Sequence, residues 1–335
     1  MKTICVKRNK KNLSEGKLIY MDIDEPKMPE CGNFVILKNL FAGVHHDDIN
    51  FLNGTYSLFD KETHPSDFIS IGLEGVGKVV EVGKNVKNIS LGGVYGYMIS
   101  IIGAYSEYVC IHKELLIKIP DTVNPAHACG AMRRGFLVYS MFKRGVRIFK
   151  DDYIVVNSVT SGVGHILAQF ASSFNIKVIG IYGSELKANY AESLGCSATI
   201  NRLTDVDYSK KILEITKGEG VRAVFDGIGL DAYENSIKSL KTFGTYIKYG
   251  NVSGDIDSKF KSIHFKEKAL FFHNQNLDLY QRIKSERVFS AMSIFKAMES
   301  FKLRIRTSEY SYQNIETAFD DIKNGKTIGS AIIKF

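Results

Sequence analysis

Residues 152–164 read DYIVVNSVTSGVG, and this stretch decides the fold of the chain. Residues 153–156 form a short β-branched run, which is typical of a buried parallel strand. A turn of small residues follows at 158–164, and the next ten residues, HILAQFASSF, have the apolar spacing of a helix. A strand, a small-residue turn and a helix in this order form a cradle for phosphate, because backbone N–H groups and the positive end of the helix meet there. We therefore expect a dinucleotide pyrophosphate to bind at Ser161, Gly162, Val163 and Gly164.

The end of the next predicted strand, residues 177–182, indicates which dinucleotide is bound. It lies about 20 residues after Gly164, where an NAD-binding fold places Asp or Glu against the ribose. This chain has Gly183-Ser184 there, with Lys187 nearby and Arg202 after the following strand. Hydroxyl and cationic groups suit a 2′-phosphate, so Ser184, Lys187 and Arg202 favour NADPH as the cofactor. Glu185 would argue for NAD if it faced the ribose, and Ser184 and Lys187 could instead serve the helix over 185–193 as a cap and a solvated face.

Length and composition indicate an ordinary globular protein with more than one core. The chain has 335 residues, which favours two domains. Its 44% hydrophobic and 24% charged residues are typical of globular chains. No apolar run approaches the roughly 18 residues of a membrane span, so no membrane partner is expected.

Charge and cysteine content argue against a nucleic-acid-binding protein and against a disulfide-bonded one. The net charge is +8, but the 44 basic residues are scattered among 36 acidic ones. The densest basic run, residues 7–11, lies between strands predicted at 3–6 and 17–21, which favours a solvated hairpin over nucleic-acid binding. The five cysteines show no CxxC pairing and indicate reduced thiols in a cytoplasmic protein.

The pattern of elements predicts two architectures in one chain. The first third is β-rich, with strands expected at 33–40, 71–82, 92–99, 104–111 and 115–120, and with no long helix before 124. Strands and helices then alternate, which predicts a doubly wound parallel sheet. Its strands are expected at 153–156, 177–182, 198–200, 221–225, 243–249 and 268–273, and its helices at 162–174, 185–193, 206–216 and 231–240. A long helix (279–300), a strand pair (302–312), a helix (314–324) and a final strand (327–334) complete the chain.

The whole chain resembles the medium-chain dehydrogenase/reductase superfamily, in its zinc-free quinone oxidoreductase branch. The resemblance is carried, in family order, by AGVHHDDINFLNGTY (42–56), IGLEGVGKVVEVG (71–83), GAYSEYV (103–109), SVTSGVGHILAQFA (158–171), VIGIYGSELKANYAESLGC (178–196), VFDGIG (224–229), GTYIKYGNVSG (244–254) and GKTIGSAIIKF (325–335). The stretches 42–56 and 244–275 look most like the prostaglandin reductases of that branch. The resemblance implies a GroES-like β-barrel catalytic domain (1–122 and 273–335) and a Rossmann domain that binds NADPH (123–272). It also implies hydride transfer to a quinone or an α,β-unsaturated ketone.

The resemblance also locates the metal positions of the zinc-dependent relatives. Their first ligand cysteine falls at His45, and their second ligand, a histidine, falls at Leu73. Leucine cannot bind a metal, and residues 83–120 lack the closely spaced cysteines of a structural zinc lobe. We therefore expect no metal.

Without a metal, the substrate oxygen needs a hydrogen-bond donor. Relatives place an Asn at the position of His45 and a Tyr at that of Tyr56, so these two residues are the expected catalytic donors, although both could simply shape the pocket. By the same resemblance Phe272 and Asn274 lie beside the nicotinamide, and their strand pairs across a two-fold axis in a homodimer. Asn251 follows a sheet strand at the edge where ligands of open α/β sheets bind.

Several residues depart from the family pattern and leave alternatives open. Relatives carry hydroxyl residues where this chain has Phe136 and Leu137, and two cations, Arg133 and Arg134, precede them. The arginines could meet cofactor phosphates, contact an acidic substrate, or cap the helix at the surface. An enoyl-thioester reductase is therefore an alternative. The changes at Ser161, Phe136 and Leu137 would also suit a catalytically silent protein that binds NADPH. RNA binding, known for some relatives, would draw on the basic balance of the chain.

Overall fold

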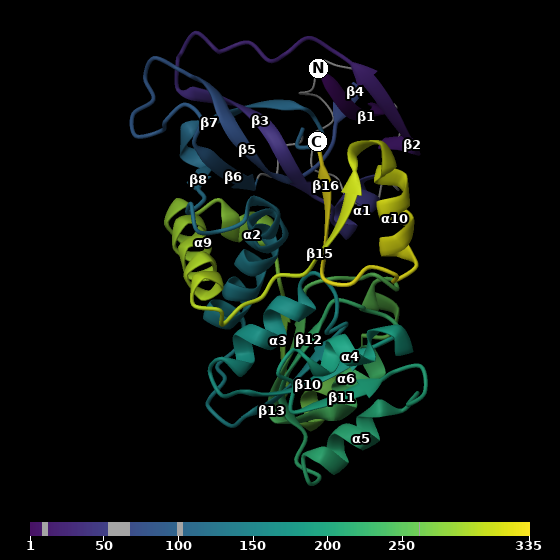
Figure 1. Cartoon of the computed structure of the whole chain (residues 1–335). Coiled ribbons are helices and arrows are strands. Elements are labelled where there is room, and N and C mark those ends of the chain that lie inside the picture. Colours follow the sequence, from purple (N-terminus) through teal and green to yellow (C-terminus); the bar gives the residue numbers. More distant parts are fainter. Residues whose placement is uncertain (9–12, 53–67, 99–102, 261) are drawn as a thin grey trace. The chain divides into compact units, whose positions relative to one another are not determined.

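The computed structural model describes residues 1–8, 13–52, 68–98, 103–260 and 262–335 (Figure 1). The chain divides into two compact units. The β-rich unit comprises Met1–Arg133, Ile283–Glu299 and Arg306–Phe335, and the α/β unit comprises Arg134–Arg282 and Ser300–Ile305. The helix α2, Pro125–Ser140, is shared between them. The domain boundaries that the sequence suggests remain a prediction.

The α/β unit contains one six-stranded sheet in which each neighbouring pair of strands is parallel. Its strands are β9 (Tyr153–Asn157), β10 (Lys177–Tyr182), β11 (Ala198–Asn201), β12 (Val221–Asp226), β13 (Leu240–Lys248) and β14 (Phe271–Asn274). Their order is β11-β10-β9-β12-β13-β14, which confirms the doubly wound sheet. The order reverses between β9 and β12, and ligands of such sheets bind in the crevice at this point.

Short helices alternate with these strands, because each parallel connection must return across a face of the sheet. They are α3 (Gly164–Ser172), α4 (Ala188–Glu192), α5 (Tyr208–Ile215), α6 (Tyr233–Ser239), α7 (Ser262–Glu267) and α8 (Leu277–Gln281). The central strands are buried on both faces, as their β-branched runs predict. Val155 on β9, Ile179 and Ile181 on β10, and Val224 on β12 lie together in the core of this unit.

The β-rich unit contains two sheets. A three-stranded sheet has the order β2-β1-β4, and a seven-stranded sheet has the order β15-β16-β3-β5-β6-β8, with β7 paired to β3. The strands are β1 (Lys2–Arg8), β2 (Leu13–Asp22), β3 (Phe34–Gly43), β4 (Phe68–Ser70), β5 (Glu74–Val82), β6 (Val94–Met98), β7 (Tyr108–His112), β8 (Leu116–Lys118), β15 (Thr307–Ser311) and β16 (Ser330–Lys334). Helices α1 (His46–Leu52), α9 (Lys284–Glu299) and α10 (Ile315–Lys323) accompany them. The final strand thus joins the sheet built by the first third of the chain, since β16 pairs with β3.

Two sequence-based predictions for the last third of the chain were wrong in detail. The helix expected over 279–300 is two helices, α8 and α9. The sequence did not reveal the break, because no glycine or proline marks it. The new helix begins after Ile283, whose carbonyl accepts the backbone N–H groups of Glu286 and Arg287. The strand pair expected over 302–312 is the single strand β15. The Arg304 backbone does not join a ladder, because its N–H and C=O both bond the Gln169 side chain at 2.9 and 3.0 Å.

None of the helices in the described residues has the length and apolarity that crossing a membrane requires. All five cysteines are free thiols.

Candidate active site

The turn after β9 is held in shape by its own backbone and one hydroxyl. Ser158 takes a left-handed φ of 57°, and its carbonyl accepts the N–H of Ser161 at 2.9 Å. The Ser161 hydroxyl in turn accepts the N–H of Gly164 at 3.1 Å, the first residue of α3. Ser161, which stands where the usual fingerprint has a glycine, is therefore an N-terminal cap that supports the turn. A Cβ at Gly164 would lie 2.2 Å from the Ser158 carbonyl oxygen, so only glycine fits there.

His165 follows this turn, and the sequence analysis did not single it out. Its Nδ1 lies 2.9 Å from the Ser161 carbonyl oxygen, so Nδ1 carries the proton. Its Nε2 is buried and has no hydrogen-bond partner within the described part of the chain. Burial lowers the pKa of His165 to about 4, with a further contribution from the Arg134 charge, and the imidazole is therefore neutral at physiological pH.

The end of β10 carries a small residue with a cation placed against it. A Cβ at Gly183 would lie 2.9 Å from Nε of Arg202, so the missing side chain leaves room for the guanidinium. Glu185 does not compete for this space, because its carboxylate accepts from the Asn201 amide at 3.1 Å. Lys187 is half-buried, and burial lowers its pKa. Ser184 precedes the short helix Glu185–Lys187, and its side chain makes no cap bond there.

The parallel register brings the remaining predicted cofactor residues to the same edge of the sheet. β10, β9, β12, β13 and β14 are consecutive neighbours, so the segments that follow them lie side by side. Asn251 follows β13, and its carbonyl accepts the N–H of Gly254 at 2.9 Å. Asn274 ends β14 and is exposed. The Phe272 ring stacks on Tyr246 with centroids 6.0 Å apart.

Asp226 anchors this edge, although the sequence analysis did not name it. It ends β12 and is fully buried. One carboxylate oxygen accepts the backbone N–H groups of Ile228 (2.8 Å) and Gly229 (3.3 Å), and the other accepts the Tyr246 hydroxyl at 2.7 Å. Burial raises the pKa of Asp226, and these three donors counter that effect. The signal that could have found it is an Asp at the very end of an apolar strand, in VFDGIG.

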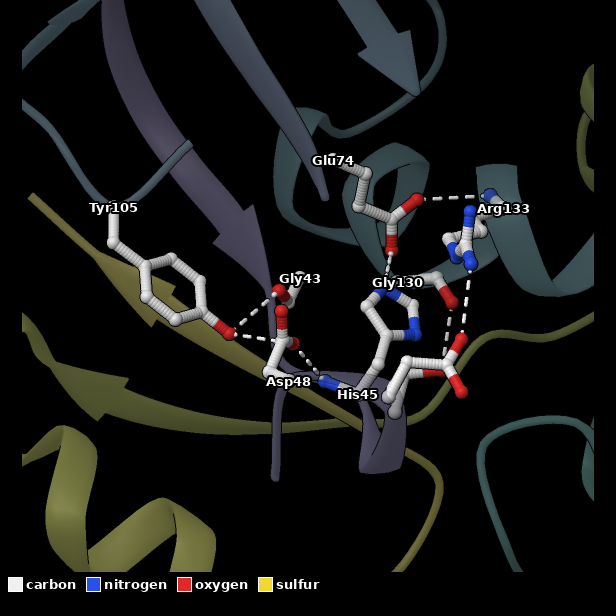
Figure 2. A network of polar contacts seen from close by, with 9 residues as sticks. Gly43, His45, Asp48, Glu74, Tyr105, Gly130 and Arg133 are labelled. Atoms are coloured by element: carbon white, nitrogen blue, oxygen red, sulfur yellow. Dashed lines mark hydrogen bonds and ion pairs between the residues drawn. The ribbon is translucent and has the colours of Figure 1, made fainter. Parts of the chain in front are cut away.

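The β-rich unit holds a second network, centred on His45 (Figure 2). His45 leaves the end of β3, and its Nε2 lies 2.8 Å from the Glu74 carboxylate. Glu74 begins β5 and is fully buried, and its second oxygen accepts the backbone N–H of Arg133 at 2.9 Å. Because a carboxylate only accepts hydrogen bonds, Nε2 of His45 carries the proton. The imidazole is therefore fixed in both orientation and tautomer.

Arg133 extends this network to Asp47, the second residue of α1. Its Nη2 lies 2.9 Å from the Asp47 carboxylate. Burial raises the pKa of Asp47, but the Arg133 guanidinium and the His45 charge outweigh that effect and hold it below its ordinary value. Arg133 and Arg134 are 3% and 5% exposed, so the interpretation of these arginines as surface residues was wrong. The sequence around these arginines could not reveal this, because the partner Asp47 lies 86 residues away along the chain.

Asp48 is a second buried carboxyl in this network (Figure 2). Its Oδ2 accepts the backbone N–H of His45 and the hydroxyl of Tyr105, each at 2.8 Å. Burial raises the pKa of Asp48 to about 7, because these two bonds only partly offset the loss of hydration. Asp48 therefore titrates in the physiological range while it supports the loop that carries His45.

Tyr56 lies outside the described residues. Leu73, which stands at the position of the second zinc ligand of the relatives, is buried. In the described ranges no three His, Cys, Asp or Glu side chains gather as a metal site would require.

Comparison with known proteins agrees with this division of the chain. Residues 32–121 match the family described as "Alcohol dehydrogenase GroES-like domain", and residues 162–284 match the family described as "Zinc-binding dehydrogenase". The chain is 26% identical to quinone oxidoreductase 1 of Escherichia coli over 304 residues, which are 90% of this chain and 91% of that protein. It is 33% identical to the 2-haloacrylate reductase of a Burkholderia species over 191 residues, or 56% and 57% of the two chains.

A third relative and one solved structure extend the likeness. Prostaglandin reductase-3 of Mus musculus is 27% identical over 255 residues, covering 76% of this chain and 64% of the relative. A mycobacterial structure in complex with NADPH superposes with a TM-score of 0.89 at 25% identity and covers all of both chains. The chain belongs to the medium-chain dehydrogenase/reductase superfamily, with a GroES-like domain and a Rossmann domain. The resemblance noted in the sequence to its quinone oxidoreductase and prostaglandin reductase members is confirmed.

Proposed function

We propose that this protein is an NADPH-dependent oxidoreductase that transfers hydride to a quinone or an α,β-unsaturated ketone. One observation carries the proposal: the turn at 158–164 lies at the reversal point of the sheet, and Arg202 lies against Gly183 at the end of the neighbouring strand β10. The names of the relatives, which include quinone oxidoreductases and reductases of unsaturated compounds, support the reaction class.

The choice of NADPH over NADH rests on the end of β10. An NAD-specific site would carry a carboxylate against the ribose. Here Arg202 packs against Gly183, and Glu185 is engaged by Asn201. Lys187 and Ser184 are close in sequence and complete a donor-rich, cationic surface for the 2′-phosphate. The turn at Ser161, Gly162, Val163 and Gly164 would hold the pyrophosphate, and Asn251, Phe272 and Asn274 would line the edge toward the nicotinamide.

The chain's own contribution to the chemistry centres on His45. When bound, the cofactor supplies a hydride, and negative charge then develops on the substrate oxygen. The His45 imidazole lies at the end of β3 with 10% of its side chain exposed, and the buried Glu74 carboxylate stabilises its protonated form. Because Nε2 of His45 donates to Glu74, we assign the hydrogen bond, or the proton, that this oxygen needs to Nδ1 of the doubly protonated imidazole, with Tyr56 as a second donor. No metal enters this scheme, since Leu73 occupies the position of a ligand.

The alternatives gain no specific support from the geometry. Arg133 already pairs with Asp47, so its charge does not mark a site for the acidic group of a thioester substrate. Ser161 supports the turn as a cap, so its presence does not indicate a lost binding site.

The proposal also covers the oligomeric state and the cellular location of the protein. β14 is the last strand of its sheet, and within the described residues its outer edge has no partner. Phe271 and Phe272 are 59% and 41% exposed on it, although exposed apolar edge strands are usually protected. We place a second copy of the chain on this edge, as a homodimer. Phe271→Lys should convert dimers to monomers in analytical ultracentrifugation. A Phe271→Lys variant that sediments as a dimer, as the wild type does, would contradict this arrangement.

The free thiols support a cytoplasmic location.

The decisive experiment is a fluorescence titration with NADPH and with NADH, followed by addition of 9,10-phenanthrenequinone or a simple enone. NADPH should bind more tightly and be oxidised by at least one acceptor. Arg202→Gln and Lys187→Ala should each weaken NADPH binding about tenfold and leave NADH unchanged, because each removes one charge from the 2′-phosphate site. Lys210→Gln, an exposed lysine on α5, is the matched control. Absence of binding by either dinucleotide would overturn the proposal.

A further inference from the structure

A pocket of about 530 Å³ lies in the β-rich unit, away from the His45 network. Its lining comes from the segment between β5 and β6, from the short helix Lys113–Leu115, from β8 and from α9. The residues that line it are Asn85, Lys87, Asn88, Ile89, Tyr95, Lys113, Glu114, Leu116, Lys118, Lys284 and Val288. We call these residues the basic pocket. Its volume lies in the range of small-molecule sites, about 300 to 1,000 Å³.

The basic pocket concentrates positive charge. Four lysines face it from four different elements, and Glu114 is its one acidic residue. The Lys284 ammonium bonds the Glu114 carboxylate, and this contact lowers the pKa of Glu114. The pair neutralises one of the four lysines and leaves Lys87, Lys113 and Lys118 uncompensated within the lining. Three like charges around one concavity raise the local concentration of anions.

Part of the lining is preorganised for a ligand. Lys113 donates from its ammonium to the Asn33 side-chain oxygen at 3.0 Å and to the Asn85 carbonyl at 2.8 Å. Asn85 is itself fixed, because its amide donates to the Cys31 carbonyl at 2.9 Å. An ammonium group has three N–H bonds. Within the described residues, two of the three N–H bonds of the Lys113 ammonium point to these oxygens, so the charge is fixed at the pocket. The third N–H is available to a ligand.

The rest of the lining is apolar. Ile89, Leu116 and Val288 contribute aliphatic surface, and the Tyr95 ring is buried. A bare inorganic ion would use only the lysine side of such a pocket. The combination of fixed ammonium groups and an apolar wall instead matches a molecule that has an anionic end and a hydrocarbon or ring portion.

We propose that the basic pocket binds a small organic phosphate, whose phosphoryl group contacts Lys113 and Lys118 and whose carbon portion packs on Leu116 and Val288. Lysine binds phosphate as a point charge, which suits a site where the exposed Lys87 and Lys118 surround the fixed ammonium of Lys113. The site is separate from the dinucleotide edge, because every lining residue belongs to the β-rich unit. The proposal is therefore independent of the proposed reaction.

The test is isothermal titration calorimetry of the full chain with phenyl phosphate as the probe. The wild type should bind the probe, and Lys113→Gln/Lys118→Gln should weaken binding at least tenfold. Lys150→Gln/Lys217→Gln, which removes two exposed lysines of the α/β unit, is the matched control and should bind the probe as the wild type does. Raising the salt concentration should weaken wild-type binding, since screening acts on exposed charges.

Two further variants distinguish binding in the basic pocket from binding elsewhere on the chain. Lys118→Gln alone changes one exposed side chain, so it keeps the test valid if the double variant is unstable. Leu116→Ser should weaken phenyl phosphate more than inorganic phosphate, because only the former reaches the apolar wall. Unchanged binding in the Lys113→Gln/Lys118→Gln variant would overturn the proposal. So would loss of binding only in an Arg202→Gln/Lys187→Gln variant, because the probe would then occupy the dinucleotide edge.

Discussion

The phosphate turn and the His45 network are built in opposite ways. The turn at 158–164 is made by residues adjacent in sequence, and three of its hydrogen bonds join residues three or four positions apart, while the Val159 N–H bonds the Ile181 carbonyl on the neighbouring strand β10. The His45 network joins α1, β3, β5 and α2. The bond between His45 and Glu74 links residues 29 positions apart, and the bond between Asp47 and Arg133 links residues 86 positions apart. The turn presents backbone, whereas the network presents side chains. Under the proposed function, this chain uses local structure to hold the cofactor and tertiary structure to place the donor.

The largest effect should come from breaking the turn. In Gly164→Ala the new Cβ would meet the Ser158 carbonyl oxygen at 2.2 Å, so the turn must open. We expect NADPH binding to weaken on the order of 100-fold, about 2.7 kcal/mol, as measured by fluorescence titration. Gly218→Ala is the control, because its Cβ would meet nothing within 4 Å and only its φ of 87° is strained. NADPH affinity in Gly164→Ala equal to that of the control would show that the backbone of the turn does not hold the cofactor.

A somewhat smaller effect concerns Asp48 and pH. The pKa of Asp48 is about 7 in the folded protein against 3.8 for the ordinary carboxyl, so the folded state keeps a proton that the unfolded chain releases. The stability that this difference contributes is fully present below the ordinary pKa and is lost as pH rises through 7. Asp48→Asn stays neutral, so its unfolding free energy relative to the wild type should rise by about 2 kcal/mol between pH 5 and pH 8. Urea unfolding at both pH values measures this.

The control for this prediction is Asp121→Asn, which alters an exposed carboxyl. Its stability relative to the wild type should stay constant over the same range. A constant difference for Asp48→Asn as well would mean that Asp48 is ionised throughout.

Removing the charge behind His45 should have a smaller effect again. Glu74→Gln keeps the shape of the side chain but no longer stabilises a protonated imidazole. We expect kcat to fall about tenfold with the chosen quinone or enone, close to 1.4 kcal/mol, while NADPH affinity stays the same. Steady-state kinetics and cofactor titration measure the two quantities separately. Glu81→Gln, at an exposed position of the same strand, is the control. If Glu74→Gln had the same kcat as this control, His45 would have no part in the reaction.

The smallest effect should come from His165, whose side chain adds only one bond to the turn, from Nδ1 to the Ser161 carbonyl. Its buried Nε2 has no hydrogen-bond partner within the described residues. His165→Leu removes this uncompensated polar atom and also the Nδ1 bond, but the Ser161 carbonyl keeps the backbone N–H of residue 165 as its donor. The unfolding free energy should therefore rise by up to about 1 kcal/mol in urea titrations. NADPH affinity should change less than twofold, because the turn binds through its backbone. A tenfold loss of affinity would instead place the imidazole in the cofactor site.

The sequence could predict those parts of the structure that depend on neighbours along the chain. The β-branched runs over 153–156 and 177–182 became parallel strands, because a strand buried on both faces must be apolar throughout. The return of the chain to the first sheet was also predicted, and β16 pairs with β3. The break between α8 and α9 was missed because apolar periodicity continues across it. The strand near Arg304 was wrongly expected, because the backbone N–H and C=O of Arg304 bond the Gln169 side chain and not a neighbouring strand.

By itself, the sequence determined the superfamily, the doubly wound sheet and the position of the phosphate turn, since these follow from local residue types and their order. Only the tertiary structure decided the roles of individual side chains. Arg133 was ambiguous until the fold placed Asp47 beside it, and His45 had no visible partner until β5 brought Glu74 within 2.8 Å. The physical reason is that strand propensity and turn geometry act within a few residues, whereas charge pairing and burial depend on which distant segments the fold brings into contact.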